Sequence, residues 1–283
     1  MPFLVVLGGG ESGVGTAILG KQKGFTVFVS DAGPIKPKYK EVLEHFDIEW
    51  ESDGHTESRV LQADVVMKSP GIPDKVALVQ RLMTTDIPVI SEMEFAGQFS
   101  DANTIGITGS NGKTTTTMLT YHLLKEAGLD VGVAGNIGDS YAKMVAEQSF
   151  EHMVLEISSF QLDGILKFKP HVAIITNITP DHLDRYEYQF EKYIASKLSI
   201  AKNQTEEDYL IYDVDDEAIA EGLKAHPVQS KKIPFSIKQK LMEGAWLENE
   251  TIKLNVEHKT LEMSTDILAL DGQHNVKNAM AAS

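Results

Sequence analysis

Short apolar runs alternate with helical patterns along most of the chain, and this alternation constrains the fold more than any other feature. The runs Phe3–Leu7 and Thr26–Ser30 are too short for helices and are typical of buried strands. Helical patterns separate them, as in a chain whose strands run parallel and whose helices cross over the sheet. The sequence therefore predicts an α/β fold that is doubly wound.

A polar stretch, SDANT at 100–104, interrupts this alternation before it starts again at Thr104–Thr108. From 231 to 270 the pattern changes towards strict alternation, which indicates strands or a hairpin. We expect two domains, because domains usually hold about 100–200 residues. The predicted boundary gives a Rossmann-like domain at 1–100 and a second, mostly parallel α/β domain at 101–283.

Composition excludes several classes of function. The 283 residues carry a formal charge of −15, so binding to nucleic acid is not expected. There is no cysteine, which excludes disulfides and thiolate metal sites. No apolar run approaches the ~20 residues of a membrane span. We expect a cytoplasmic protein with no membrane partner.

The first glycine-rich loop, Gly8 to Gly13, follows a predicted strand and fits the pattern G-x-G-x-x-G. Asp31 stands at the end of the next strand. Its distance in sequence from the last glycine of the loop is close to the roughly 20 residues at which a ribose-binding acid occurs. Taken alone, this indicates a nicotinamide or flavin enzyme. Any nucleotide diphosphate meets the same physical terms, including a nucleotide-sugar, and a tight turn without a ligand is a further alternative.

The second glycine-rich loop, GSNGKTT at 109–115, lies between a predicted strand and a predicted helix. In the usual phosphate-binding pattern the first glycine would stand at position 107, where this chain has Ile107. The loop is therefore shorter than usual. Lys113 would balance phosphate charge, and Thr114 carries the hydroxyl expected on Mg²⁺.

Acidic residues at the ends of two later strands are candidate metal ligands. Glu156 ends an apolar strand, where an unpaired charge would be costly. Asp181, His182 and Asp184 follow another strand. In open α/β sheets ligands bind beyond the carboxyl ends of strands, so these groups should meet the phosphate loop at one edge. A salt-bridged core acid and a loop histidine without a role are the alternatives.

Five motifs in order resemble the ATP-dependent Mur ligases of peptidoglycan synthesis. They are TGSNGKTT, AGNIG (134–138), LEISSFQLD, NITPDHLDRY and GQHNVKNAMAA (272–282). The shortened loop is a property of that family. Residues 156–162 are most similar to the members that add D-glutamate. The resemblance implies a Rossmann-like domain, a P-loop-type ATPase domain and a third domain, which we expect this chain to lack.

The resemblance also implies site residues. Those implied for ATP are Gly109, Ser110, Asn111, Gly112, Lys113, Thr114, Thr115, Asn275 and Asn278. Those implied for the UDP-substrate are Gly13, Val14, Asp31, Ser69, Pro70, Gly71, Asn136, Ser158 and Gln161. Thr114 and Glu156 would hold one Mg²⁺ and His182 a second. Lys197 matches the carbamylated lysine of the family, whose carboxylate helps hold the metals. Without the family we would interpret it as a solvated helix lysine.

The implied reaction joins D-glutamate to UDP-N-acetylmuramoyl-L-alanine. ATP would phosphorylate the substrate carboxylate, and the amine of D-glutamate would then displace phosphate. The catalytic residues would be Lys113, Glu156, His182 and Lys197. We expect the protein to be a monomer. We also expect this chain, as a fragment, to be inactive on its own. The alternatives are a sibling ligase, a folylpolyglutamate-synthase-like ligase, or a nucleotide-binding fragment without catalysis.

Overall fold

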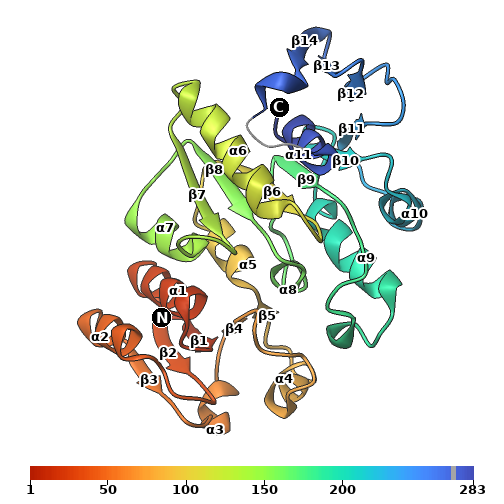
Figure 1. The fold of residues 1–283 in the computed structure, drawn as a ribbon. Coiled ribbons are helices and arrows are strands. Elements are labelled where there is room, and N and C mark those ends of the chain that lie inside the picture. The colour runs from red at the N-terminus through yellow and green to blue at the C-terminus, as the bar shows by residue number, and fades with distance from the viewer. Residues whose placement is uncertain (269–271) are drawn as a thin grey trace. The chain divides into compact units, whose positions relative to one another are not determined.

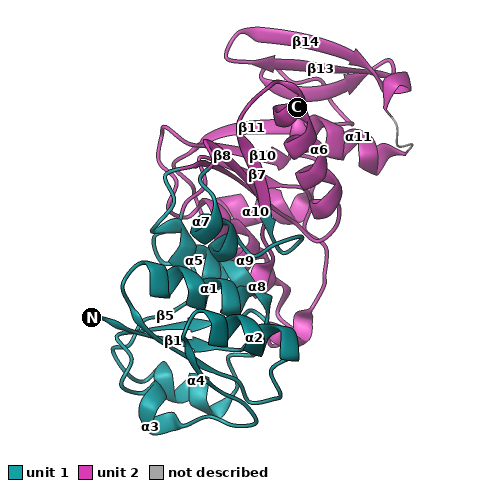
Figure 2. Ribbon diagram, turned by 90° about the vertical axis from the view of Figure 1, so that its left-hand side faces the viewer, with its two compact units in different colours: residues 1–101, 134–149, 160–168 teal, residues 102–133, 150–159, 169–283 magenta. Residues whose placement is uncertain are grey.

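The computed structural model describes residues 1–268 and 272–283, and these form two compact units. Unit 1 comprises Met1–Asp101, Ala134–Ser149 and Phe160–Phe168. Unit 2 comprises Ala102–Val133, Phe150–Ser159 and Lys169–Ser283 (Figure 2). The chain therefore leaves unit 2 twice to add a segment to unit 1.

Unit 1 contains a five-stranded sheet whose neighbouring strands are all parallel (Figure 1). Its spatial order is β3 (Glu49–Glu51), β2 (Thr26–Ser30), β1 (Phe3–Leu7), β4 (Val65–Lys68) and β5 (Val89–Ile90). The helices of the unit are α1 (Glu11–Gln22), α2 (Pro37–His45), α3 (Glu57–Val60), α4 (Ala77–Leu82), α5 (Glu92–Gly97) and α7 (Tyr141–Glu147). Helix α8 (Ser159–Leu162) begins at the last residue of a unit 2 segment.

Unit 2 is built on a nine-stranded sheet. Its spatial order is β14 (Lys259–Ser264), β13 (Thr251–Val256), β12 (Gly244–Glu248), β11 (Lys231–Ser236), β10 (Tyr209–Asp213), β9 (Val172–Ile175), β6 (Asn103–Thr108), β8 (His152–Glu156) and β7 (Val131–Gly135). Its helices are α6 (Lys113–Glu126), α9 (Phe190–Leu198), α10 (Glu217–Ala225) and α11 (Gln273–Ala282), with short 3₁₀ turns at η1 (Leu183–Arg185), η2 (Ser199–Ala201) and η3 (Thr265–Ile267). The last two residues of β7 belong to unit 1.

The pairing of strands in unit 2 decides where polar side chains meet. Strand β6 pairs in parallel with β8 on one side and with β9 on the other. Fully buried Ile107, Val154 and Ile174 fill the core around these strands. Their carboxyl ends consequently lie at one edge of the sheet, where ligands of open α/β sheets bind. Strands β13 and β14 are antiparallel to their neighbours, so the sheet is mostly parallel.

The predicted fold class is confirmed: both units are α/β, and parallel pairing predominates. Strands β1 and β2 have the bounds expected from the apolar runs. Among the described residues, no helix combines the length and apolar character needed to cross a bilayer.

Candidate functional site

The loop between β6 and α6 depends on two glycines. Gly109 has φ +150° and Gly112 has φ +82°, which side chains with a Cβ rarely adopt. A Cβ at Gly109 would also collide with the hydroxyl of Thr176. Helix α6 begins at Lys113, so the unpaired N–H groups of its first turn lie beside the loop. Such a helix start favours bound phosphate.

Residues that follow β9 hold this loop in place. The backbone N–H of Ser110 donates to the carbonyl oxygen of Asn177, and that of Asn111 donates to Oδ1 of Asn177, both at 2.9 Å. The Thr176 hydroxyl donates to the carbonyl oxygen of Asn111 at 2.7 Å. The Ser110 hydroxyl donates to the carbonyl oxygen of Thr179 at 2.9 Å. The loop therefore has a fixed shape before any ligand binds.

Lys113 folds back over the loop. Its Nζ donates to the carbonyl oxygens of Gly109 at 2.9 Å and Ser110 at 3.0 Å. Burial lowers the pKa of Lys113 below its usual value, and the charges of Glu156 and Asp181 oppose that change. The ammonium group is thus held at the loop itself, which suits a group that neutralises phosphate charge.

Glu156 and Thr114 meet as the sequence analysis expects. The Thr114 hydroxyl donates to Oε2 of Glu156 at 2.7 Å. Glu156 ends β8, is 1% exposed and pairs with Ile107 of β6. A hydroxyl and a carboxylate are hard oxygen ligands, and Mg²⁺ often takes only one or two protein carboxylates beside phosphate oxygens and water. The pair fits Mg²⁺ in that way. No group of three or more His, Asp or Glu within residues 1–268 and 272–283 could hold a metal ion alone.

Two further predicted residues differ in their surroundings. Lys197 of α9 is 2% exposed, and its Nζ donates to the Thr108 hydroxyl at 3.2 Å and the Gly109 carbonyl oxygen at 2.9 Å. It therefore lies directly behind the loop. His182 has a left-handed backbone with φ 49°, and its Nε2 lies 3.5 Å from Asp181 Oδ2. More than half of its side chain is exposed, in contrast to Lys197.

Helix α11 brings the two predicted asparagines to the same loop. A Cβ at Gly112 would collide with Oδ1 of Asn278, and the Thr116 hydroxyl donates to that oxygen at 3.4 Å. Asn278 Nδ2 in turn donates to Oδ1 of Asn275 at 3.4 Å. Both side chains are thus near the start of α6, where a nucleotide bound to the loop would lie.

Unit 1 contains a pocket of about 500 Å³ at the carboxyl ends of β1, β2 and β4. Among the predicted residues, Asp31, Ser69, Pro70 and Gly71 line it. Other residues that line it are Gly8 and Gly10 of the first glycine-rich loop, Glu11 and Ser12 at the start of α1, and His55, which was not predicted. Gly13 and Val14 are buried in α1 and do not appear in this lining.

Asp31 organises the first glycine-rich loop. Its Oδ2 accepts the N–H of Gly9 at 2.7 Å, and its Oδ1 accepts the N–H of Gly33 at 2.9 Å. Gly13 lies so close to the carbonyl oxygen of Gly8 that a Cβ would collide with it. Both residues therefore shape the loop, and a direct contact with a ligand stays a prediction for each.

The remaining predicted residues come from both units. Asn136 is exposed and Gln161 is buried, and both belong to segments of unit 1. Ser158 belongs to unit 2 and is half-buried, two residues after the end of β8.

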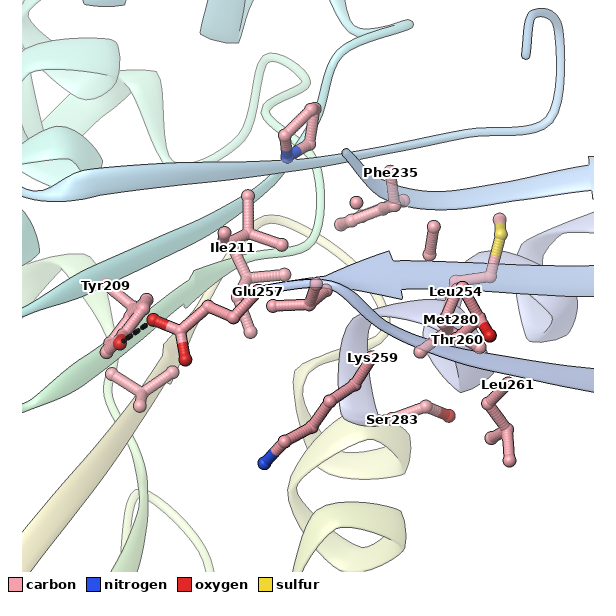
Figure 3. Close-up of a pocket in the computed structure, with 16 residues that line it drawn as sticks. Tyr209, Ile211, Phe235, Leu254, Glu257, Lys259, Thr260, Leu261, Met280 and Ser283 are labelled. Atoms are coloured by element: carbon pink, nitrogen blue, oxygen red, sulfur yellow. Dashed lines mark hydrogen bonds between the residues drawn. The ribbon is translucent and has the colours of Figure 1, made fainter. Parts of the chain in front are cut away.

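A second pocket of about 500 Å³ lies in unit 2 beside strands β10 to β14 and the end of α11 (Figure 3). Its walls are mostly apolar, with Ile211, Phe235 and Leu254 among them. At one end the Tyr209 hydroxyl donates to Oε1 of Glu257 at 2.6 Å. The predicted site residues are absent from the lining that the described part of the chain provides.

Sequence profiles of two known domains match the chain. The Mur ligase middle domain matches residues 107–283, and the MurD N-terminal domain matches residues 4–77. The chain belongs to the Mur ligase family. The middle-domain match begins in β6 and contains the phosphate loop, Glu156, Lys197 and α11.

Two curated relatives share the name UDP-N-acetylmuramoylalanine--D-glutamate ligase. The chain is 62% identical to UDP-N-acetylmuramoylalanine--D-glutamate ligase of Christiangramia forsetii, over 99% of its own length and 63% of that protein. It is 49% identical to the ligase of the same name from Bacteroides fragilis, over its whole length and 63% of that protein. The chain thus spans less than two thirds of the length of these relatives.

Solved structures of other Mur ligases share the fold. The UDP-N-acetylmuramate:L-alanyl-gamma-D-glutamyl-meso-diaminopimelate ligase from Neisseria meningitides has a TM-score of 0.65 at 19% identity, covering all of this chain and 92% of that one. The UDP-N-acetylmuramate-alanine ligase MurC from Thermotoga maritima has a TM-score of 0.56 at 21% identity, covering all of this chain and 64% of that one.

Sequence reasoning missed several residues that support the Mur ligase phosphate loop. Thr176, Asn177 and Thr179 form hydrogen bonds with the loop. The motif NITPDHLDRY was recognised, but this role of its first residues and of Thr176 was not. Tyr193 was missed as well, and its hydroxyl lies 3.1 Å from that of Ser110. The available signal was position: Thr176 to Thr179 follow a strand whose carboxyl end meets the loop.

Proposed function

We propose that the chain is the nucleotide-binding part of a ligase that adds D-glutamate to UDP-N-acetylmuramoyl-L-alanine. The reaction would belong to cytoplasmic synthesis of peptidoglycan precursors, and the protein would act as a monomer. The observation that carries the ATP-dependent part is the Thr114–Glu156 pair beside Lys113 at the mouth of the phosphate loop. The 62% identity to a ligase of that name supports the choice of substrates.

The proposed chemistry activates a carboxylate. A carboxylate oxygen of the L-alanyl group attacks the γ-phosphorus of ATP, and the bond to ADP breaks. The amine of D-glutamate then attacks the acyl carbon, phosphate leaves, and the amine loses a proton. Lys113 would neutralise phosphate charge, and the backbone N–H groups at the start of α6 would orient the phosphates. Bound Mg²⁺ would supply further charge neutralisation, with one ion held by Thr114 and Glu156 and a second by His182.

The unit 1 pocket and the phosphate loop of unit 2 would bind different ligands. The unit 1 pocket has a glycine-rich loop at a helix start, which suits the diphosphate of a UDP-sugar. The loop of unit 2 would take ATP, with Asn275 and Asn278 near the adenine. Residues 1–100 would thus provide most of the substrate domain and residues 101–283 the ATPase domain.

Substrate binding can be tested at Gly10, where an added Cβ meets no other atom within 4 Å. Gly10→Leu should therefore fold normally while its side chain fills the pocket that Gly10 lines. We expect affinity for UDP-N-acetylmuramoyl-L-alanine to fall by at least roughly tenfold, the effect of losing about 1.4 kcal/mol. Titration calorimetry measures this, and ATP affinity serves as the internal control. Unchanged substrate affinity would show that the substrate binds elsewhere.

Carbamylation of Lys197 can be tested by carbon NMR. The amine nitrogen would attack CO₂ and release a proton, leaving a carboxylate on the side chain. With ¹³C-bicarbonate the chain should show a carbamate carbonyl signal that Lys197→Met lacks. Methionine has an apolar stem of similar length, which suits this buried position. A signal that persists in the variant, or no signal in the parent chain, would contradict the assignment.

A further inference from the structure

Helix α5 of unit 1 carries two glutamates that are almost fully buried. Glu92 is 0% exposed and Glu94 is 2% exposed, and the helix is only six residues long. A buried carboxylate is costly unless hydrogen bonds satisfy it. Neither residue lines the unit 1 pocket, so direct ligand binding there does not explain them.

Glu94 binds three consecutive backbone amides. Its Oε2 accepts the N–H of Leu166 at 2.9 Å, of Lys167 at 2.9 Å and of Phe168 at 2.8 Å. Successive N–H groups that converge on one oxygen form a concavity suited to an anion. The acceptor and its three donors are 72 to 74 residues apart in sequence. Glu94 therefore anchors the end of the segment Phe160–Phe168.

Glu92 makes the corresponding contact with the other inserted segment. Its Oε1 accepts the N–H of Ala142 at 3.0 Å, in the first turn of α7. Burial raises the pKa of Glu92, and the Ala142 N–H and the nearby hydroxyls of Ser12 and Ser140 oppose the rise. Ser12 belongs to the first glycine-rich loop and lines its pocket. Glu92 thus lies where that loop meets the segment Ala134–Ser149.

Backbone packing around α5 supports the same attachment. The N–H of Ser91 donates to the carbonyl oxygen of Gly164 at 2.9 Å. A Cβ at Gly164 would lie 2.6 Å from the Ser91 nitrogen, closer than real side chains come. The segment can therefore lie this close to the start of α5 only because residue 164 is glycine.

We propose that Glu92 and Glu94 are positioning residues: they fix the two inserted segments in unit 1 and thereby place Asn136 and Gln161 for the UDP-substrate. Asn136 lies in the segment that Glu92 holds, and Gln161 in the segment that Glu94 holds. The choice of ligand rests on the proposed function, whereas the anchoring does not.

Hydrogen exchange tests the anchoring without any ligand. In Glu94→Ala we expect the amides of residues 166–168 to exchange at least roughly tenfold faster, because local opening becomes easier. Glu92→Ala should do the same at Ala142, and Glu92→Gln should restore protection since its amide oxygen can accept the same N–H. Glu147→Ala is the matched control, because it removes an exposed carboxylate from the same unit. Unchanged exchange in Glu94→Ala would overturn the proposal.

Substrate affinity tests the positioning role. We expect Glu94→Ala to bind UDP-N-acetylmuramoyl-L-alanine roughly tenfold more weakly, because the binding-competent form is less populated. ATP affinity should change by less than about twofold, since Glu94 and its three donors belong to unit 1 and the phosphate loop belongs to unit 2. Faster exchange with unchanged substrate affinity would overturn positioning. If the parent chain itself bound no UDP-substrate, the proposed function would fail while the exchange result still decided the anchoring.

Two further variants protect these tests against a fold defect. Glu94→Gln removes the charge and keeps one acceptor oxygen, so its effects should lie between those of the parent and Glu94→Ala. Gly164→Ala disturbs the same segment without changing a carboxylate. Both should loosen residues 166–168, and a variant that loosened the segment while binding substrate normally would contradict the proposal.

Discussion

Lys113→Ala is expected to lower the affinity of the chain for ATP by at least roughly 100-fold. A hydrogen bond to a charged group contributes about 1.5–3 kcal/mol, and Lys113 would make more than one to the phosphates. In the structure its Nζ already lies 2.9–3.0 Å from two carbonyl oxygens of the loop. Removing the ammonium also leaves the loop less constrained. Titration calorimetry with ATP measures the change directly.

Lys125→Ala is the matched control for this prediction. Lys125 lies in the last turn of the same helix, and its side chain contacts Tyr121 instead of the loop. Its ATP affinity should equal that of the parent chain. If Lys113→Ala bound ATP as well as the control does, the phosphate site would not be at this loop.

Local patterns in the sequence predicted much of the fold. The apolar runs gave β1 and β2 with their observed bounds. Helix α5 begins directly after Ser91, a residue type that often caps helices, and the Ser91 hydroxyl accepts the N–H of Glu94 at 3.4 Å. Strands β3, β7 and β10 were missed. Their runs are short, and β7 reads VGVAG, where glycine weakens the strand signal.

Local sequence patterns carry no information about long-range packing, and the two inserted segments are an example. Nothing within 134–149 or 160–168 indicates that these residues pack with unit 1. Their attachment depends on Glu92 and Glu94, which are far away in sequence. The same limit applies to Lys197: most lysines on helices are solvated, so its burial behind Gly109 has no local signal.

The prediction that the phosphate loop and Glu156 meet at one edge of the sheet agrees with the structure. The sequence placed the phosphate loop and Glu156 at the carboxyl ends of neighbouring strands, and the structure brings Thr114 and Glu156 to 2.7 Å. This worked because parallel pairing fixes which strand ends meet. The roles of these residues with ATP and Mg²⁺ stay predictions.

Glu156→Gln is expected to remove most of the effect of Mg²⁺ on ATP binding. Glutamine has the same size and can still accept the hydrogen bond from Thr114, so the fold should persist. It has no charge, and Mg²⁺ binds to proteins mainly through carboxylates. Even residues that only support a metal ligand change metal affinity by about 10–100-fold, so a direct ligand should do at least as much.

The measurement compares ATP affinity with and without Mg²⁺ in the parent chain and in the variant. The parent should bind ATP much more tightly when Mg²⁺ is present, whereas Glu156→Gln should show little difference. Glu151→Gln is the matched control, because Glu151 is an exposed acid immediately before the same strand. Because Glu156 also raises the pKa of Lys113 through its charge, ATP binding without Mg²⁺ must be compared first. Equal Mg²⁺ dependence in Glu156→Gln and the parent would place the metal away from β8, and the Thr114–Glu156 pair would then serve only to hold the loop.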